Sequence, residues 1–329
     1  MKPVRVAPDW TVIVATYNRA ESLCQTLKTL AFQATDGQFT YEVLVSDNGS
    51  TDHTRAAVKA LQPDFPAPLR YCYEGRRGKS WALNTGIAHA RGRFLAFTDD
   101  DVLATPTWLA RLWQCFREEA ADAIGGKVVP RWTAPRPAWL TDEMVRRLDS
   151  LGCLDYGDRR LLKYYRWVGG NVAIRRDVVE RVGGYDVRLA RTQDTEYYQR
   201  CRRAGLTIVY EPTAVVQHQI GPERMTPAYF RQWRARTGYY HAYLHQWRKY
   251  HLLTIMPMSW YQVMGRWLAR WVMSVVRFRP WQDRFVPEIM LRDYGQQFLH
   301  RVQMWPAWCA AVVCGRSRQW SGLPAQQSR

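Results

Sequence analysis

Short apolar runs alternate with helix-like stretches through the first third of the chain. The runs at 10–16, 41–45 and 94–97 are rich in β-branched or aromatic residues and have the length of buried strands. Residues 20–30 carry leucines three and four positions apart, and residues 79–87 repeat apolar side chains at similar spacing. This strand–helix–strand order predicts an α/β domain with a mostly parallel sheet and flanking helices.

Three consecutive aspartates follow the third apolar run. Residues i and i+2 of an extended chain face the same side, so Asp99 and Asp101 are expected to project together. They would lie beyond the carboxyl end of the strand, where open α/β sheets bind their ligands. Carboxylates held on one side favour a cation between them, and hard oxygen ligands suit Mg²⁺ or Mn²⁺. For an isolated triplet, a simple acidic turn is the alternative.

The second apolar run also ends in a polar turn, at Ser46–Asp52. This turn combines an acidic residue, a glycine that is free to adopt positive φ, and the Ser, Thr and Asp residues that favour helix starts. Such a turn leaves backbone N–H groups and side-chain oxygens available to the base and ribose of a nucleotide. Polar turns after neighbouring strands therefore predict a nucleotide site at one edge of the sheet.

The order and spacing of these motifs resemble the family 2 glycosyltransferases with the GT-A fold, which are inverting enzymes that use nucleotide sugars. The motifs that carry the resemblance are Thr16–Asn18, Asp47–Asp52, Gly78–Lys79, Ala82–Asn84, Thr98–Asp101, Gly169–Asn171, Gly183–Asp186, Gln193–Glu196 and Arg200. The resemblance covers residues 1–220, where it implies a Rossmann-like, mostly parallel sheet. It leaves residues 221–329 as a separate region, expected to be helical.

The resemblance assigns several residues to a nucleotide-sugar donor, expected to be UDP- or dTDP-linked. These donor-binding residues are Thr16, Asn18, Asp47, Lys79, Asp99 and Asp100. Asp47 would accept a hydrogen bond from the base, and Asp99 would contact the ribose. Lys79 would neutralise a pyrophosphate oxygen as a compact charge. Asn18 could instead cap a helix, and Lys79 could be a solvated lysine on a helix face.

The resemblance also implies a divalent cation, Mg²⁺ or Mn²⁺, held by Asp101 with His218 as a further ligand. The cation would stabilise the departing nucleoside diphosphate as a Lewis acid. His218 follows the strand-like stretches 207–210 and 214–216, the place where the family often has a histidine. A structural histidine is the alternative.

The acceptor hydroxyl must lose a proton as it attacks the anomeric carbon, which requires a positioned base. Asp194 matches the second position of the family's Glu-Asp motif, at the start of a predicted helix whose dipole favours the ionised carboxylate. Gln193 stands where the family usually has Glu. The expected acceptor-binding residues are Gly170, Asn171 and Gln193, although a plain turn would also explain the glycine.

The last third of the chain has a different composition. Residues 221–329 contain 16 Lys or Arg and 4 Asp or Glu, a net charge of +12 out of +18 for the whole chain, and 9 of the 16 tryptophans. The apolar segment 251–278 is interrupted by Arg266 and Arg270, so it lacks the roughly 20 uninterrupted apolar residues of a membrane span.

Within this segment, Trp267 and Trp271 recur at helical spacing with Leu268, Met264 and Val275. The arginines beside them are placed as snorkelling side chains would be at lipid headgroups. The pattern predicts an amphipathic helix on an anionic membrane surface. A helical subdomain packed on the catalytic core is the alternative.

Cysteine usage and the N-terminus bear on the expected compartment. Seven cysteines without a CxxC pair predict free thiols in a reducing cytosol. No apolar stretch precedes Trp10, so no secretory signal is expected. The predicted location is cytoplasmic, at the inner face of the cytoplasmic membrane where the protein associates with lipid.

Three other classes of function compete with a glycosyltransferase acting on a glycan or lipid-linked acceptor. A nucleic-acid-binding protein would explain the basic composition, but the acidic triplet would repel a phosphate backbone, so no nucleic-acid partner is expected. A nucleotidyltransferase would need a glycine-rich first loop, and residues 12–19 contain no glycine. A non-catalytic glycosyltransferase-like protein would not need Asp99, Asp101 and Asp194 together.

Overall fold

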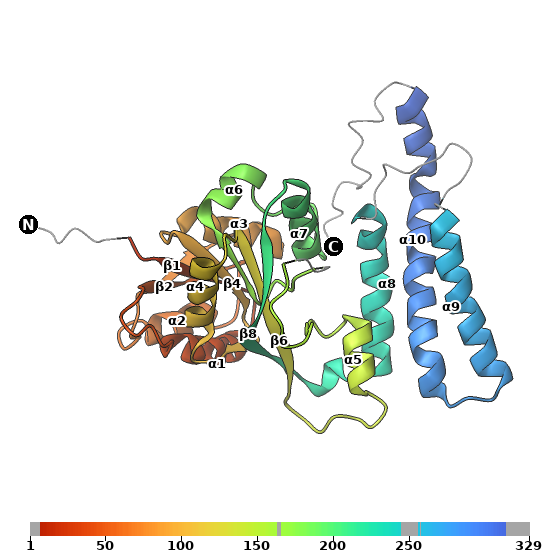
Figure 1. Ribbon diagram of the computed structural model, residues 1–329, viewed down its shortest axis with the longest axis horizontal. Coiled ribbons are helices and arrows are strands. Elements are labelled where there is room, and N and C mark those ends of the chain that lie inside the picture. The colour runs from red at the N-terminus through yellow and green to blue at the C-terminus, as the bar shows by residue number, and fades with distance from the viewer. Residues whose placement is uncertain (1–6, 163–165, 245–255, 257, 314–329) are drawn as a thin grey trace, which may run out of the picture. The chain divides into compact units, whose positions relative to one another are not determined.

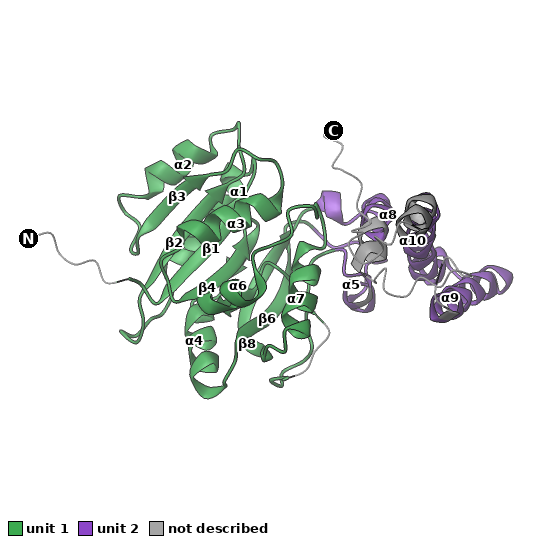
Figure 2. Ribbon diagram, turned by 90° about the horizontal axis from the view of Figure 1, so that it is seen from above, with its two compact units in different colours: residues 1–134, 151–221 green, residues 135–150, 222–329 purple. Residues whose placement is uncertain are grey.

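The computed structural model describes residues 7–162, 166–244, 256 and 258–313 (Figure 1). The chain forms two compact units, drawn in different colours in Figure 2. Residues 1–134 and 151–221 form the sheet unit, and residues 135–150 and 222–329 form the helical unit. The helical unit thus begins near the residue where the motif pattern ends, but it also takes in residues 135–150 from the middle of the sequence.

One eight-stranded sheet organises the sheet unit, with the strand order β3-β2-β1-β4-β7-β6-β8-β5. The strands are β1 (Trp10–Thr16), β2 (Tyr41–Asp47), β3 (Leu69–Tyr73), β4 (Phe94–Asp99), β5 (Val102–Ala104), β6 (Ala123–Trp132), β7 (Val172–Arg175) and β8 (Ile208–Ile220). The first four neighbours pair in parallel, as predicted. β7 runs antiparallel between β4 and β6, β8 is parallel to β6, and β5 is antiparallel to β8, so the complete sheet is mixed.

Helices cover both faces of this sheet, because alternate residues of each buried strand point to opposite sides. They are α1 (Ala20–Ala31), α2 (Thr54–Leu61), α3 (Lys79–His89), α4 (Trp108–Glu118), α6 (Arg176–Val182) and α7 (Gln193–Arg203). Val12 and Val14 of β1 pack in one core with residues of α1, α2 and α4. Ile13 and Ala15 pack in a second core with residues of α3, α6 and α7. The α/β architecture predicted from the sequence is confirmed.

The helical unit contains α5 (Asp142–Leu148), the 3₁₀ turn η1 (Pro222–Arg224), α8 (Pro227–Leu244), α9 (Met258–Val276) and α10 (Trp281–Val313). α8 and α9 each pack against α10. Trp139 lies 5.4 Å from Phe285 of α10 and 5.7 Å from Phe230 of α8, measured between ring centroids. These aromatic contacts explain why residues 135–150 belong to this unit. Among the helices of the described residues, none has an apolar stretch long enough to cross a membrane.

Candidate active site

Three parallel strands end side by side at the predicted ligand-binding edge of the sheet. Thr16 at the end of β1 is in register with Asp47 at the end of β2, and Ala15 of β1 is in register with Asp99 at the end of β4. The parallel pairing therefore brings these predicted donor-binding residues to one edge, although they lie far apart in the sequence. This is the position at which open α/β sheets bind ligands.

The three consecutive aspartates take different partners. β4 ends at Asp99, and the chain turns at Asp100 and Asp101, so the strand alternation used to pair Asp99 with Asp101 does not extend to Asp101. Asp99 forms an ion pair with Lys79. Asp100 accepts a hydrogen bond from the Thr16 hydroxyl at 2.8 Å. Strand alternation was expected to point Asp99 and Asp101 to the same side. This argument is wrong, because the strand ends before Asp101.

Arg19 binds two of the three carboxylates. Its Nη1 lies 3.1 Å from Asp100 Oδ1 and 2.8 Å from Asp101 Oδ2. Burial by itself disfavours the charged guanidinium, but the charges of Asp100 and Asp101 raise the pKa of Arg19 above its usual value. Burial, opposed by Arg19, raises the pKa of Asp100 to about 6. Arg19 thus reduces the repulsion within the acidic triplet, a role that the sequence analysis missed.

Lys79 links the donor edge to the predicted base. Burial disfavours its ammonium form, but the charge of Asp99, its hydrogen bond and the charges of Asp194 and Asp101 together raise the pKa of Lys79. Lys79 is the first residue of α3, directly after Gly78, whose φ of 129° is accessible to glycine. Lys79 is about one-third exposed and forms an ion pair with Asp99, and its predicted contact with a pyrophosphate oxygen stays a prediction.

Asp101 and His218 come together through strand pairing. β5 pairs antiparallel with β8, with Val102 opposite His218, and the amide of Gln219 donates to the carbonyl oxygen of Asp101 at 2.9 Å. This register places His218 Nε2 3.3 Å from Asp101 Oδ1. Both side chains are buried.

The orientation of the His218 ring is set by its other nitrogen. Nδ1 lies 2.6 Å from the carbonyl oxygen of Leu151, which can only accept, so Nδ1 carries a proton and Nε2 is the nitrogen that faces Asp101. Gly152 lies against the same ring, where an added Cβ would lie 3.2 Å from His218 Cε1. A carboxylate oxygen and an imidazole nitrogen oriented in this way fit a divalent cation. Among the described residues, no group of three His, Cys, Asp or Glu side chains is assembled as a metal site.

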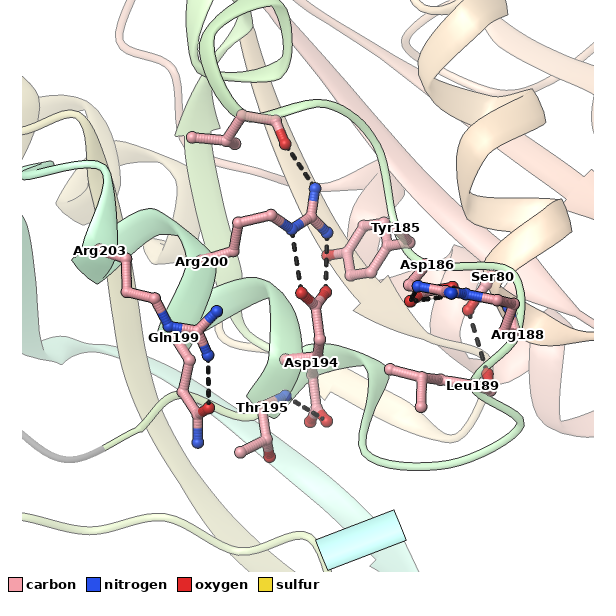
Figure 3. Close-up of polar contacts among 12 residues, drawn as sticks. Ser80, Tyr185, Asp186, Arg188, Leu189, Asp194, Thr195, Gln199, Arg200 and Arg203 are labelled. Carbon is pink, nitrogen blue, oxygen red and sulfur yellow. Dashed lines mark hydrogen bonds and ion pairs between the residues drawn. The ribbon is translucent and has the colours of Figure 1, made fainter. Parts of the chain in front are cut away.

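Asp194 lies in the first turn of α7, as predicted, and its carboxylate is held by two backbone amides. Oδ2 accepts from the Gly169 N–H at 3.1 Å, and Oδ1 accepts from the Thr195 N–H at 2.9 Å, the second contact being visible in Figure 3. The buried indole of Trp167 donates to the Asp194 carbonyl oxygen at 2.8 Å. These contacts fix the position of the carboxylate.

The glycine pair 169–170 lies between Asp194 and the donor edge. An added Cβ at Gly169 would lie 3.4 Å from Asp194 Cβ, and one at Gly170 would lie 3.4 Å from Asp99 Oδ2. The backbone of this turn thus contacts the predicted base on one side and the end of β4 on the other. Gly170 thus lies beside the donor residue Asp99, and its predicted contact with the acceptor stays a prediction.

Asn171 has a structural role, and its predicted contact with the acceptor is corrected. Its side chain is fully buried, donates to the carbonyl oxygens of Lys127 and Ala214, and accepts from the indole of Trp108 at 2.8 Å. Its backbone is also engaged, since its N–H donates to Val168 O. Because every polar group of Asn171 has a partner inside the protein, this residue supports the glycine turn.

Gln193 differs from Asn171 in this respect. Its side chain is nine-tenths buried, and within the described part of the chain Oε1 has no hydrogen-bond partner. A buried carbonyl oxygen without a partner costs about 1–3 kcal/mol. Gln193 is the first residue of α7 and precedes Asp194 in the sequence.

Two loops at the donor edge are held by the remaining predicted residues. Asn18, with φ of 51°, accepts from the Thr51 N–H at 2.7 Å, and its own N–H donates to Ser50, so it fastens the loop after β2 and does not cap α1. The buried Asp47 carboxylate accepts from the Ser50 N–H and, at 2.6 Å, from the Tyr71 hydroxyl. Burial and the charge of Asp47 raise the pKa of Tyr71.

α3 also holds the segment that leads into α7. Asn84 donates to the carbonyl oxygen of Tyr185 and accepts from its N–H at 2.8 Å. The Ser80 hydroxyl donates to Leu189 O, a contact drawn in Figure 3. The Tyr185 ring stacks on Tyr197 of α7 with centroids 4.5 Å apart. The Ala82–Asn84 and Gly183–Asp186 motifs therefore act together, since one binds the backbone of the other and so positions α7.

The comparisons with known proteins agree with this geometry. Residues 11–183 match the model of glycosyl transferase family 2. The succinoglycan biosynthesis protein ExoM of Rhizobium meliloti is 29% identical over 234 residues, which cover 70% of this chain and 73% of that protein. The glucosyl-dolichyl phosphate glucuronosyltransferase of Haloferax volcanii is 29% identical over 226 residues, 64% of this chain and 69% of that protein.

Two solved structures show the likeness of fold. The mannosyltransferase PcManGT from Pyrobaculum calidifontis, solved in complex with GDP-Man and Mn²⁺, aligns with a TM-score of 0.55 at 22% identity, covering 94% of this chain and 76% of that one. GalNAc-T7, solved with UDP, GalNAc and Mn²⁺, aligns with a TM-score of 0.53 at 15% identity, covering 76% of this chain and 53% of that one. At these identities the likeness concerns the fold.

Proposed function

This chain belongs to glycosyl transferase family 2 and is a glycosyltransferase, and from that premise we propose that it transfers a sugar from a nucleotide sugar with inversion at the anomeric carbon. The donor is a UDP- or dTDP-sugar, and the acceptor is a glycan or a lipid-linked sugar of surface polysaccharide synthesis. The relative named for succinoglycan biosynthesis supports the second part. Family membership excludes the nucleotidyltransferase alternative.

The observation that carries the proposal is the glycine turn at 169–170. It contacts the Asp194 carboxylate on one side and Asp99 on the other. A donor bound over the ends of β1, β2 and β4 would therefore have its sugar next to the carboxylate that is fixed at the start of α7. Catalysis of this kind depends on holding base and electrophile in reacting geometry.

In the proposed reaction, Asp194 removes the proton from an acceptor hydroxyl while that oxygen forms a bond to the anomeric carbon. The bond from this carbon to the diphosphate oxygen breaks, and the nucleoside diphosphate leaves with the electron pair. Lys79 lies where it can bind the diphosphate, at the cost of its ion pair with Asp99. The buried Oε1 of Gln193 could accept a hydrogen bond from the acceptor only if the start of α7 opened to expose it.

Asp101 and His218 would hold a divalent cation. When bound, the cation stabilises the negative charge that develops on the leaving group. Arg19, which binds Asp100 and Asp101, keeps the carboxylates together before donor and cation arrive. Asp47 and the loops fastened by Asn18 form the floor for the base and ribose.

The proposal is tested with purified protein, a panel of nucleotide sugars and Mn²⁺. A bound donor should raise the unfolding temperature by mass action, and chelator should abolish both the shift and the release of nucleoside diphosphate. His218→Gln should weaken the Mn²⁺-dependent shift, whereas His89→Gln, a substitution of the exposed histidine at the end of α3, should leave it unchanged. Full transfer in the presence of chelator would contradict the proposed role of the cation. The absence of a response to any nucleotide sugar would favour the non-catalytic alternative.

A further inference from the structure

The C-terminal half of α9 and its connection to α10 expose several large apolar side chains. α9 ends at Val276, and α10 begins at Trp281. The exposed large apolar residues in this stretch are Leu268, Trp271, Val272, Met273, Val276, Phe278 and Trp281. We call this set, with Arg266, Arg270, Arg277 and Arg279, the tip patch. Apolar exposure concentrated in this way marks an interaction surface.

The spacing along α9 sorts the patch into two lines. Leu268, Val272 and Val276 lie four residues apart, so they follow one line on the helix surface. Arg266 and Arg270 lie four residues apart on a second line, and Arg277 follows directly after the end of the helix. Both lines are exposed to solvent. α9 is therefore amphipathic on its outer side.

The apolar stripe predicted from the sequence differs from the apolar line that is exposed in the structure. Met264, Trp267 and Val275 are partly buried, and Arg270 covers the Trp267 ring at 5.0 Å from its centroid. Trp260 of α9 packs on Tyr294 and Phe298 of α10. Trp260 thus contributes to packing within the helical unit, whereas Trp271 and the aliphatic line are exposed.

Phe278 is the most exposed residue of the patch. Its side chain is 91% exposed, and its φ is 51°, a backbone region that bulky residues rarely adopt. It lies between Arg277 and Arg279 and two residues before Pro280-Trp281. In the free protein, the exposure of the Phe278 side chain to water and the positive φ of its backbone are both unfavourable. Burial of the side chain in an apolar medium would offset the cost of its exposure.

The charge of the patch favours an anionic partner. The sequence contains no Asp or Glu between Arg224 and Gln282. The nearest carboxylate in the turn is Asp283, which lies 3.9 Å from Arg279 with both side chains more than half exposed. The four arginines of the patch therefore act as a cationic surface next to an apolar one. This combination is the signature of a helix that lies in the headgroup region of a membrane.

We infer that the tip patch docks on an anionic phospholipid bilayer. The Leu268–Val272–Val276 line, Phe278 and Trp281 enter the boundary between headgroups and acyl chains. The arginines remain at the level of the lipid phosphates, where Trp and Arg side chains are both favoured. The tip patch binds the headgroup layer of a lipid surface, and this binding requires no membrane-spanning helix.

The test uses the full chain and flotation with vesicles of phosphatidylcholine alone or of phosphatidylcholine with phosphatidylglycerol. Wild-type protein should float with the anionic vesicles, and binding should weaken from 0.05 M to 1 M salt as the Debye length falls to about 3 Å. Arg266→Gln, Arg270→Gln and Arg277→Gln together should lower affinity about 100-fold, since each arginine near an anionic surface contributes about fivefold.

Phe278→Asn separates lipid binding from stability. Asparagine accepts positive φ better than phenylalanine does, so the unfolding temperature should stay the same or rise, while lipid affinity falls about tenfold with the loss of an apolar side chain. The control is Phe32→Gln with Arg117→Gln, which removes an exposed aromatic and an exposed arginine from the sheet unit. This control should float like wild type.

Three results would overturn the inference. The first is equal flotation of wild type on neutral and anionic vesicles, or on neither. The second is a loss of binding in the control equal to that in the patch variants. The third is a wild-type dimer in analytical ultracentrifugation that Phe278→Asn converts to a monomer without any effect of lipid, which would assign the patch to a second copy of this chain.

Discussion

The candidate active site and the tip patch place their charged side chains in opposite ways. In the candidate active site, carboxylates that are buried or half-buried are paired with Arg19, Lys79 or backbone amides. In the helical unit, arginines stand at the surface of the α9–α10 connection beside exposed apolar side chains. A buried, partnered charge costs desolvation and gains fixed geometry, which suits a reaction centre. An exposed cation keeps its hydration and can exchange it for a flat anionic surface.

The largest effect should come from the base of the sheet unit. Asp194→Asn keeps the shape of the side chain but cannot accept a proton, so kcat should fall by about two to four orders of magnitude. Donor-induced thermal shifts and vesicle flotation should not change. The measurement is initial transfer rate at saturating donor and acceptor, alongside both binding assays.

Glu196→Gln provides the matched control on the same helix. Glu196 pairs with Arg200 through two hydrogen bonds, and Figure 3 shows Arg200 in this position. Its loss should reduce stability slightly and leave kcat within a few-fold of wild type. The assignment of the base would be reversed if Glu196→Gln lost the activity and Asp194→Asn kept it.

Close packing of the sheet unit predicts a large stability loss from one added methyl group. A Cβ at Gly92 would lie 2.3 Å from the Thr11 nitrogen and 2.4 Å from the Trp10 carbonyl carbon, both of them backbone atoms that cannot move aside. Gly92→Ala should therefore lower the free energy of unfolding by about 3 kcal/mol or more. Urea denaturation measures this, and a loss below about 1 kcal/mol would show that the strand end is more adaptable than the structure indicates.

Acid should loosen the helical unit before the sheet unit. Burial and the neighbouring Arg301 lower the pKa of His300 to about 4, so the folded state binds this proton more weakly than the unfolded chain does. Stability is then lost as pH falls from about 6.5 through 4, by about 3 kcal/mol at most. The hydrogen bonds from Arg76 lower the pKa of Glu74 in the sheet unit to about 2, so its contribution is lost only as pH falls below about 4.3.

Pulse proteolysis in urea at pH 7 and pH 4.5 can resolve this difference, because the fragments report each unit by its own sequence. His300→Gln should flatten the pH dependence of the helical unit. The exposed substitution His89→Gln should not. If both units lose stability in parallel between pH 6.5 and 4.5, burial of His300 is not the cause.

The smallest expected effect is a gain in the helical unit. Gly265 lies within α9, and an added Cβ would meet nothing within 4 Å. Gly265→Ala should stabilise this unit by about 0.5–1 kcal/mol, because alanine loses less backbone entropy in a helix. Substitution of glycine by alanine is therefore expected to lower the free energy of unfolding at Gly92 and to raise it at Gly265. A destabilisation at Gly265 would indicate that another surface covers α9 in solution.

Much of the sheet unit could be predicted from local sequence. The apolar runs, the polar turns after them and the placement of Asp194 at the start of a helix are short-range properties, set by the period of buried strands and by helix-end chemistry. The basic, tryptophan-rich composition of the C-terminal region can likewise be read directly from the sequence. The order of the motifs was sufficient to identify the family, because each motif marks the end of an element whose position in the sheet follows from the fold.

Contacts between distant residues were decided by the tertiary structure. The β5–β8 register brings His218 to Asp101, and no local pattern specifies that pairing. Asn171 has the polarity of a binding residue, but burial against Gly126 and Trp108 turns it into a support for the glycine turn. The outer line of α9 emerges only once α10 covers the opposite side. Local patterns determine which elements form and which face is apolar, whereas the availability of a polar or apolar side chain depends on what packs against it.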